Sequence, residues 1–146
     1  MKTTDTNESR TLSTLSTGIE IIELLRFHDQ AGVTELAEIL DISKGTVCTY
    51  LKTLEKGELV VQSGNKYELS KKFLVLGEYV RNTNELYQKG KQKIDQLANE
   101  TGHYASIVVY ENGRGINLYQ AKGSETIGDE YQEAKFRHRD YLHMTA

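Results

Sequence analysis

Residues 34–57 read TELAEILDISKGTVCTYLKTLEKG, and this stretch decides the fold. Thr34 is in position to cap a short helix, and a tight connection with the apolar Ile42 follows it. Ser43 is in position to cap a longer helix that ends at Lys56-Gly57. The residues expected to face the core are Leu36, Ala37, Leu40, Val47, Tyr50, Leu51 and Leu54. A short helix, a tight turn and a second helix are the order of a helix-turn-helix.

The chain before this stretch predicts one more helix, beginning near Gly18. Its apolar stripe consists of Ile19, Ile21, Ile22, Leu24, Leu25 and Phe27. Ser16 or Thr17 is expected as its N-cap, and Gly32 is expected to end it in the left-handed conformation. Residues 1–14 are rich in Thr, Ser, Asn and charge, which predicts a mobile arm.

The pattern changes its period after Gly57. Residues 59–61 and 66–69 are typical of two strands joined by a turn at residues 63–65. Three helices followed by a small hairpin predict a winged helix-turn-helix, in which the third helix can enter the DNA major groove.

The C-terminal half predicts helices and a second hairpin. Ser70 is expected to open one helix, and another is expected from Leu86 to Glu100, ending at Thr101-Gly102. The strands 105–110 and 116–121 are expected to flank a turn at residues 111–115. The pattern then fades into a charged stretch at residues 123–140. The predicted fold class is α+β.

The composition of the chain excludes several classes of protein. The chain has 146 residues, 38% hydrophobic and 27% charged, which is typical of a soluble protein. It contains no apolar run of membrane-spanning length, and its polar N-terminus is unlike a secretory signal. Cys48 is the single cysteine, which excludes an internal disulfide and, with the other features, favours the cytoplasm. The net charge of −3 excludes an overall basic coat for nucleic acid, but it leaves room for a local basic patch.

Positive charge gathers on the third predicted helix. Residues 43–57 carry three lysines and one glutamate, whereas residues 34–41 carry three acidic residues and no basic one. This is the distribution that phosphate contacts require. The residues expected to bind DNA are Arg10, Thr34, Ser43, Lys44, Gly45, Thr46, Thr49, Tyr50, Lys52 and Lys66. In a purely structural reading, Lys52 and Lys56 are solvated, Tyr50 belongs to the core and Cys48 is inert.

The sequence favours no catalytic, metal or cofactor site. His28, His103, His138 and His143 lie in different predicted segments without metal-ligand spacing. Residues 113–115 (Gly-Arg-Gly) lack the features of a phosphate loop and suit a hairpin turn. The acidic stretch at residues 125–133 is typical of a solvated loop. We therefore expect a protein that is not an enzyme and has no cofactor.

Several segments together resemble the IclR family of prokaryotic transcription regulators. The segments that carry the resemblance are 16–25, 32–37, 43–47, 50–57, 67–70, 73–77, 94–102 and 142–146. The residues used in these segments are similar to those of archaeal, especially haloarchaeal, members of the family. The reading helix departs from the family, because Cys48 and Thr49 stand where relatives often carry His and Arg, and Gly45 where they often carry Ser.

The resemblance implies a division of the chain. It implies a flexible arm at 1–14, a winged helix-turn-helix at 15–70, a linker helix at 71–84 and an incomplete α/β effector-type domain at 85–146. In the family, most residues that bind small effectors come later than Ala146, so an effector is not expected here. Uncovered edges of the second hairpin would favour dimerisation, aggregation or a frayed C-terminal part.

Two functions follow from these observations. The first is a regulator that binds double-stranded DNA as a homodimer or higher oligomer, with the helix Ser43–Gly57 in the major groove. The second is a protein-interaction module that dimerises with a full-length relative and modulates it without strong DNA binding. The acidic total charge and the absence of arginine from the reading helix favour the second.

Overall fold

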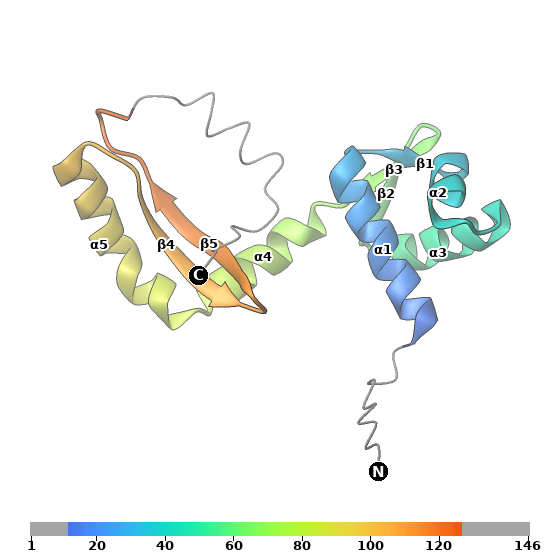
Figure 1. Cartoon of the computed structure of the whole chain (residues 1–146), viewed down its shortest axis with the longest axis horizontal. Helices are drawn as coiled ribbons and strands as arrows, with labels where there is room; N and C mark the ends of the chain where they lie inside the picture. The colour runs from blue at the N-terminus through green and yellow to red at the C-terminus, as the bar shows by residue number, and fades with distance from the viewer. Residues whose placement is uncertain (1–11, 127–146) are drawn as a thin grey trace, which may run out of the picture. The chain divides into compact units, whose positions relative to one another are not determined.

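A computed structural model describes residues 12–126, which divide after Phe73 into two compact units (Figure 1). The first unit contains α1 (Ser13–His28), β1 (Ala31–Gly32), α2 (Val33–Leu40), α3 (Lys44–Lys56), β2 (Val60–Ser63) and β3 (Lys66–Leu69). The second contains most of α4 (Lys72–Asn82), with α5 (Glu85–Thr101), β4 (Ala105–Glu111) and β5 (Arg114–Ala121). These helices and antiparallel strands confirm the α+β class. Arg10 and the predictions for residues 127–146 lie outside the described residues.

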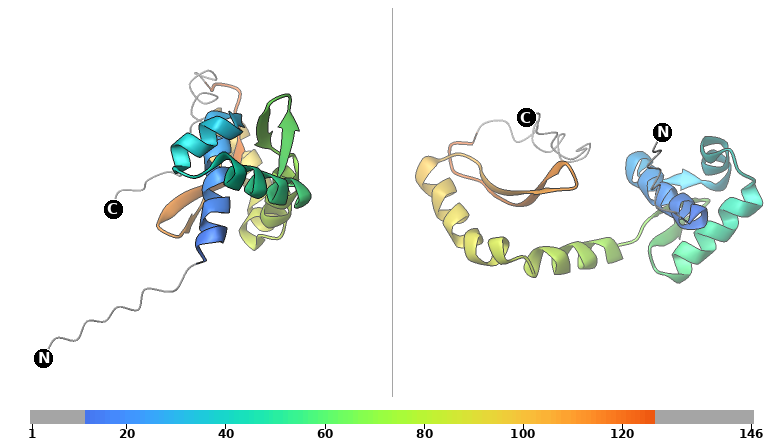
Figure 2. Two further views of the ribbon diagram at one scale, coloured as in Figure 1. Left: turned by 90° about the vertical axis from the view of Figure 1, so that its right-hand side faces the viewer. Right: turned by 60° about the horizontal axis from the view of Figure 1, so that its bottom comes forward.

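The first unit is a winged helix-turn-helix. Its sheet has the order β1-β3-β2, and all of its pairs are antiparallel. Val60 lies opposite Leu69 in the wing hairpin, and Gly64 turns the chain with a φ of 64°. Figure 2 shows this hairpin extending beside α3. β1 adds a two-residue edge strand to this sheet. The sequence did not predict it, because its partners Lys66 and Tyr67 are distant in sequence.

Apolar burial holds the three helices of the first unit together. The large side chains that are less than 2% exposed are Ile21, Leu25, Leu36, Val47, Leu51 and Val60. They come from all three helices and from the wing, and Tyr50 and Ile42 pack against them from the edge. Complete burial of each such side chain stabilises the fold by roughly 1.5–3 kcal/mol. The core therefore fixes α3 in the unit by its Val47 and Leu51 side.

The start of α1 differs from the prediction. The helix begins at Ser13, five residues before Gly18, and Leu12 is its N-cap without a side-chain hydrogen bond. Ser16 and Thr17 are inside the helix, where their hydroxyls donate to the carbonyls of Leu12 and Ser13. The predicted N-cap is therefore wrong, because each hydroxyl bonds backward to a carbonyl four residues earlier instead of accepting from a later N–H.

The connection between α1 and α2 also differs. The left-handed residue after α1 is Asp29, with a φ of 62°. Gly32 has a φ of −89° and serves as the N-cap of α2, and its N–H donates to the Glu35 carboxylate at 3.4 Å. Thr34 is inside the first turn of α2 rather than at its cap. Pairing of β1 with β3 accounts for this shift, because it holds Gly32 extended.

The second unit joins helices α4 and α5 to a β-hairpin. The Asn84 side chain caps α5, accepting from the N–H groups of Leu86 and Tyr87. Gly102 ends α5 with a φ of 74°, as the sequence predicts. The hairpin turn is shorter than the predicted 111–115, because Asn112 and Gly113 both have positive φ and form a two-residue turn.

α5 packs against the β4–β5 hairpin through small residues. The buried cluster there is Ala98, Ala105 and Ala121, with Ile94 and Tyr119 packed against it. A Cβ added at Gly90 would lie 3.0 Å from the Ile107 side chain, so the absent side chain lets helix and hairpin approach closely. None of the helices in residues 12–126 is both long and apolar enough to cross a membrane.

Candidate DNA-binding surface

Ser43 fixes the first turn of α3. Its Oγ accepts from the N–H of Thr46 at 3.1 Å, and its hydroxyl also shares a 2.8 Å hydrogen bond with the Thr46 hydroxyl. The predicted cap is confirmed, and the helix ends at Lys56 as expected. Because the core holds the middle of α3 and Ser43 holds its start, the helix presents a defined surface.

One face of α3 is buried and the other is open. Val47 and Leu51 are fully buried, whereas the residues of the opposite face are exposed. The exposed residues of α3 are Lys44, Gly45, Thr46, Thr49, Lys52, Thr53, Glu55 and Lys56. The structure thus brings together five of the predicted site residues on one side of α3, with Ser43 at its start. Tyr50 is half-buried and packs against the core, which supports the structural reading of that residue.

The threonine hydroxyls of α3 bond inside the helix. Thr49 Oγ1 donates to the carbonyl of Gly45 at 3.0 Å, and Thr53 Oγ1 donates to the carbonyl of Thr49 at 2.8 Å. Thr46 Oγ1 is bonded to Ser43. A hydroxyl has a single hydrogen to donate, so Thr49 and Thr53 offer only acceptor lone pairs toward solvent. The γ-methyl groups are the parts of these side chains that no hydrogen bond uses.

An apolar groove of about 840 Å³ lies beside this threonine face, between α3 and the first turns of α1. Leu12, Leu15 and Gly18 form the α1 side, and Thr46, Thr49 and Tyr50 belong to the α3 side. Leu12 and Leu15 are more than 60% exposed. The open face of α3 therefore combines a polar edge of lysines with an apolar hollow.

The lysines of this surface are available for phosphate. In the described part of the chain, no carboxylate lies within ion-pairing distance of Lys44, Lys52, Lys56 or Lys66. Lys66 is exposed at the first position of β3, next to the turn of the wing. Thr34 is exposed on α2, one helix away from the lysines of α3.

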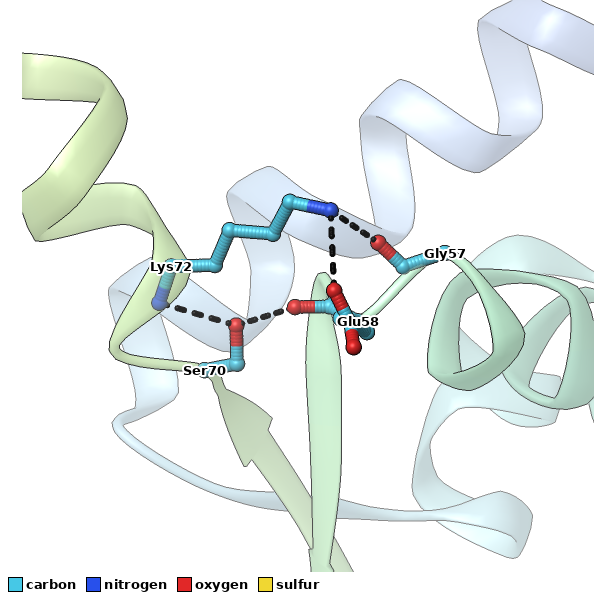
Figure 3. Close-up of polar contacts among 4 residues, drawn as sticks. All are labelled: Gly57, Glu58, Ser70 and Lys72. Atoms are coloured by element: carbon cyan, nitrogen blue, oxygen red, sulfur yellow. Dashed lines mark hydrogen bonds and ion pairs between the residues drawn. The ribbon is translucent and has the colours of Figure 1, made fainter. Parts of the chain in front are cut away.

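A polar junction ties the end of α3 to the start of α4 (Figure 3). The Lys72 ammonium donates to the carbonyl of Gly57 at 2.9 Å and lies 3.3 Å from the Glu58 carboxylate. The Ser70 hydroxyl donates to the carbonyl of Glu58 and accepts from the N–H of Lys72. The sequence predicted that Ser70 opens the helix, but no signal in it indicated the bonds to residues 57 and 58.

A second polar cluster lies between α5 and β5. Lys91 and Tyr119 both donate to the Asp95 carboxylate, the former at 2.8 Å, and Lys91 lies 4.8 Å from the centre of the Tyr119 ring. These hydrogen bonds hold the pKa of Asp95 below its ordinary value and that of Lys91 above it. The i, i+4 spacing of Lys91 and Asp95 was visible in the sequence, but Tyr119 was not an expected partner. The cluster therefore stabilises the charged forms of Asp95 and Lys91.

The described residues bring no three metal-ligating side chains together. No group of at least three His, Cys, Asp or Glu residues in residues 12–126 could hold a metal ion. His28 and His103 lie in separate units, while His138 and His143 are outside the described part. The turn at Gly113 is a hairpin turn, as the structural reading of residues 113–115 proposed.

Comparison with known proteins places residues 14–64 in the family described as the IclR helix-turn-helix domain. Over 125 residues the chain is 36% identical to "Probable HTH-type transcriptional regulator ArcR" of Halobacterium salinarum, covering 85% of this chain and 48% of that protein. It is 24% identical over 117 residues to "HTH-type transcriptional regulator XynR" of Escherichia coli, covering 77% and 46%. The chain spans about half the length of these curated relatives.

Solved structures give the same fold. An IclR transcriptional regulator from Alicyclobacillus acidocaldarius matches with a TM-score of 0.61 and 26% identity, covering 77% of this chain and 47% of that one. The IclR of Thermotoga maritima matches with a TM-score of 0.67 and 18% identity over the same shares. The second likeness concerns the fold alone.

Proposed function

Residues 14–64 are an IclR helix-turn-helix domain, and from this we propose that the chain is a transcriptional regulator that binds double-stranded DNA. The observation that carries the proposal is the open face of α3, where Lys44 and Lys52 stand free of carboxylates beside Thr46 and Thr49. In this proposal α3 lies in the major groove with its first turns at the base edges. The relatives named as transcriptional regulators support the same role.

The wing and the N-terminal arm would add contacts to the backbone. Lys66 on the wing is exposed and its charge is unpaired in the described residues, which suits a phosphate contact. Arg10 on the arm would reach a phosphate or the minor groove. Thr34 would contact the backbone from α2. These contacts would position the domain without reading the sequence.

The chain would act as a homodimer or higher oligomer on a pseudo-palindromic site. Exposed apolar side chains support this part of the proposal. On α4 they are Leu74, Val75, Leu76, Tyr79 and Val80, and no residue of α4 is buried. On α1, Ile19 and Phe27 are more than half exposed. A helix such as α4, which exposes several large apolar side chains and buries none, suits a protein interface. A regulator of this kind would work in the cytoplasm, without a cofactor, and any effector would remain to be found.

The proposal is tested by mobility shift of the 146-residue chain on the DNA upstream of its own gene, across a salt series and against random competitor DNA. Saturable binding that outcompetes random DNA and falls steeply with salt is the expected result. Lys44→Ala should weaken binding to all sequences and lower the salt slope by about one. Lys93→Ala, an exposed lysine of α5, is the matched control and should leave both unchanged.

The exposed apolar residues also favour a second candidate function. In this alternative the chain pairs with a full-length relative and modulates it, with little DNA binding of its own. A folded chain that fails to bind DNA at low salt but associates with a co-expressed relative would favour it. Unchanged affinity and salt slope in Lys44→Ala would also count against the DNA role of α3.

A further inference from the structure

Apart from two lysines, the reading face of α3 lacks the side chains that recognise bases by paired hydrogen bonds. Bidentate recognition of guanine requires arginine or lysine, and that of adenine requires asparagine or glutamine. Between Ser43 and Leu54 the sequence contains no arginine, asparagine, glutamine, aspartate or glutamate. Lys44 and Lys52 are the only charged groups there. Direct readout by this helix must therefore rest on the threonines or on the two lysines.

Thr49 and Thr53 cannot donate freely to base edges. Thr49 and Thr53 give their hydroxyl hydrogens to carbonyls of α3, and the Thr46 hydroxyl is bonded to Ser43. The helix geometry that makes these bonds leaves the γ-methyl groups without a polar partner. Positions 46, 49 and 53 share one side of α3, so their methyl groups form a stripe.

The surroundings of this stripe are apolar. The groove beside it is lined from α1 by Leu12, Leu15 and Gly18 and from α3 by Tyr50. Lys44 and Lys52 lie on the exposed surface of the same helix. The exposed lysines suit phosphate, and the apolar groove suits a methyl-bearing base edge. Among the four bases, thymine alone presents a methyl group in the major groove.

We propose that α3 recognises thymine by methyl–methyl contact, with Thr49 at the centre of the contact and Thr46 and Thr53 on either side. The inference rests on the proposed function and specifies what the surface reads. The threonine hydroxyls act inside the helix, where they hold each γ-methyl in one rotamer. The lysines hold the phosphates, and the thymine methyl groups select the site.

The test begins with a duplex selected by the wild-type chain from a random-sequence library. Single thymines in that duplex are then replaced by deoxyuridine, which removes the methyl group and keeps every hydrogen-bonding atom. Loss of a contacted methyl should weaken binding about fourfold, which corresponds to roughly 0.8 kcal/mol per buried methyl-sized group. No variant protein is needed for this arm, so misfolding cannot obscure it.

Two variants of Thr49 separate the methyl from the hydroxyl. Thr49→Ser removes the methyl and keeps the hydroxyl, so it should bind the thymine duplex about fourfold more weakly and lose discrimination against deoxyuridine at one position. Thr49→Val keeps the methyl and removes the hydroxyl, so it should still discriminate thymine from deoxyuridine at that position. Thr83→Ser is the matched control, because Thr83 is exposed and its hydroxyl also donates to a carbonyl four residues earlier.

The outcomes are distinct. Equal binding of thymine and deoxyuridine duplexes by the wild-type chain overturns the inference and leaves the proposed function intact. Loss of discrimination in Thr49→Val but not in Thr49→Ser also overturns it, because the hydroxyl would then be the reading group. If the selection enriches no sequence and the chain binds no duplex, both the proposed function and the inference fall.

Discussion

The two units of this chain are stabilised in different ways. The first unit buries six large side chains almost completely, and they come from α1, α2, α3 and β2. In the described part of the second unit the buried hydrophobic residues are three alanines and Ile107, and α4 buries none. Its helix and hairpin are joined in addition by Lys91, Asp95 and Tyr119 in partly exposed positions. Partly exposed ion pairs contribute far less than apolar burial.

This difference in packing implies that the first unit is the more rigid of the two. A helix that reads DNA must hold its side chains in one geometry, and the first unit provides this through a tight core around Val47 and Leu51. The second unit depends on small residues and polar contacts, which open locally at lower free energy. We therefore expect the second unit to exchange its amide hydrogens faster than the first.

The largest expected effect comes from removing a core side chain. Leu51→Ala should lower the free energy of unfolding of the first unit by about 2–5 kcal/mol, because it leaves a cavity among fully buried residues. Leu97→Ala on α5 is the matched change in the second unit, where the leucine is 47% exposed and the cost should stay below about 1 kcal/mol. Urea unfolding followed by circular dichroism measures both. Equal losses of unfolding free energy at the two sites would contradict the expected difference between the units.

The N-caps of α3 and α5 test the same difference between the units, with a smaller expected effect. Ser43→Ala and Asn84→Ala each remove a side chain that accepts from the first turn of a helix, and each should cost about 1 kcal/mol. In the first unit the core holds α3 in place, so the loss should appear as lower global stability. In the second unit it should appear as local fraying of α5. Hydrogen exchange distinguishes the two, and identical exchange patterns would contradict the expectation.

Local signals made part of the fold predictable. The Ser43 cap and the apolar period gave α3 its observed end at Lys56, and residues 66–69 were predicted as the strand that is found. Asn112-Gly113 lies inside the turn that was predicted too long. These features depend on residues close together in sequence, where caps and turns have strong preferences.

Contacts between distant residues account for the rest. β1 exists because Ala31 and Gly32 pair with β3, which also moved the cap of α2 from Thr34 to Gly32. The early start of α1 could not be found from a buried stripe, because Leu12 and Leu15 are exposed. For the candidate site, the sequence indicated the face of α3. The internal hydroxyl bonds of Thr49 and Thr53 depend on side-chain rotamers, which no sequence pattern specifies.

A smaller effect is expected at the junction between the first unit and α4. Lys72→Ala removes the contacts to the Gly57 carbonyl and the Glu58 carboxylate, and it should lower stability by less than about 1 kcal/mol because the side chain is 40% exposed. Lys71→Ala is the control, since Lys71 has a 3.6 Å ion pair with Glu68 but does not reach the end of α3. Faster amide exchange at residues 57–59 in Lys72→Ala alone would support the junction. The same exchange in both variants would show that the effect comes from losing a surface charge and not from losing the junction.

The smallest expected effect is the change in stability of the second unit at acidic pH. Hydrogen bonds from Lys91 and Tyr119 hold the pKa of Asp95 below the ordinary value of 3.8. A carboxyl group with a lowered pKa in the folded state contributes stability above pH 3.8, and this contribution is lost as the pH falls through the lowered pKa. The first unit buries no ionisable side chain among its described residues, so its midpoint should change less over the same acidic range. Asp95→Asn should therefore lower the thermal midpoint of the second unit slightly at neutral pH and flatten its acid dependence.

Glu100→Gln, on the same helix and exposed, is the control for this change and should keep the wild-type acid dependence. Thermal midpoints measured from neutral pH into acid, with the amide NMR signals of α5, β4 and β5 as the probe, follow the second unit. Parallel curves for Asp95→Asn and the wild-type chain would show that solvent screens the cluster completely. The second unit would then depend on its small apolar contact alone, and the contrast with the first unit would be sharper than the polar contacts suggest.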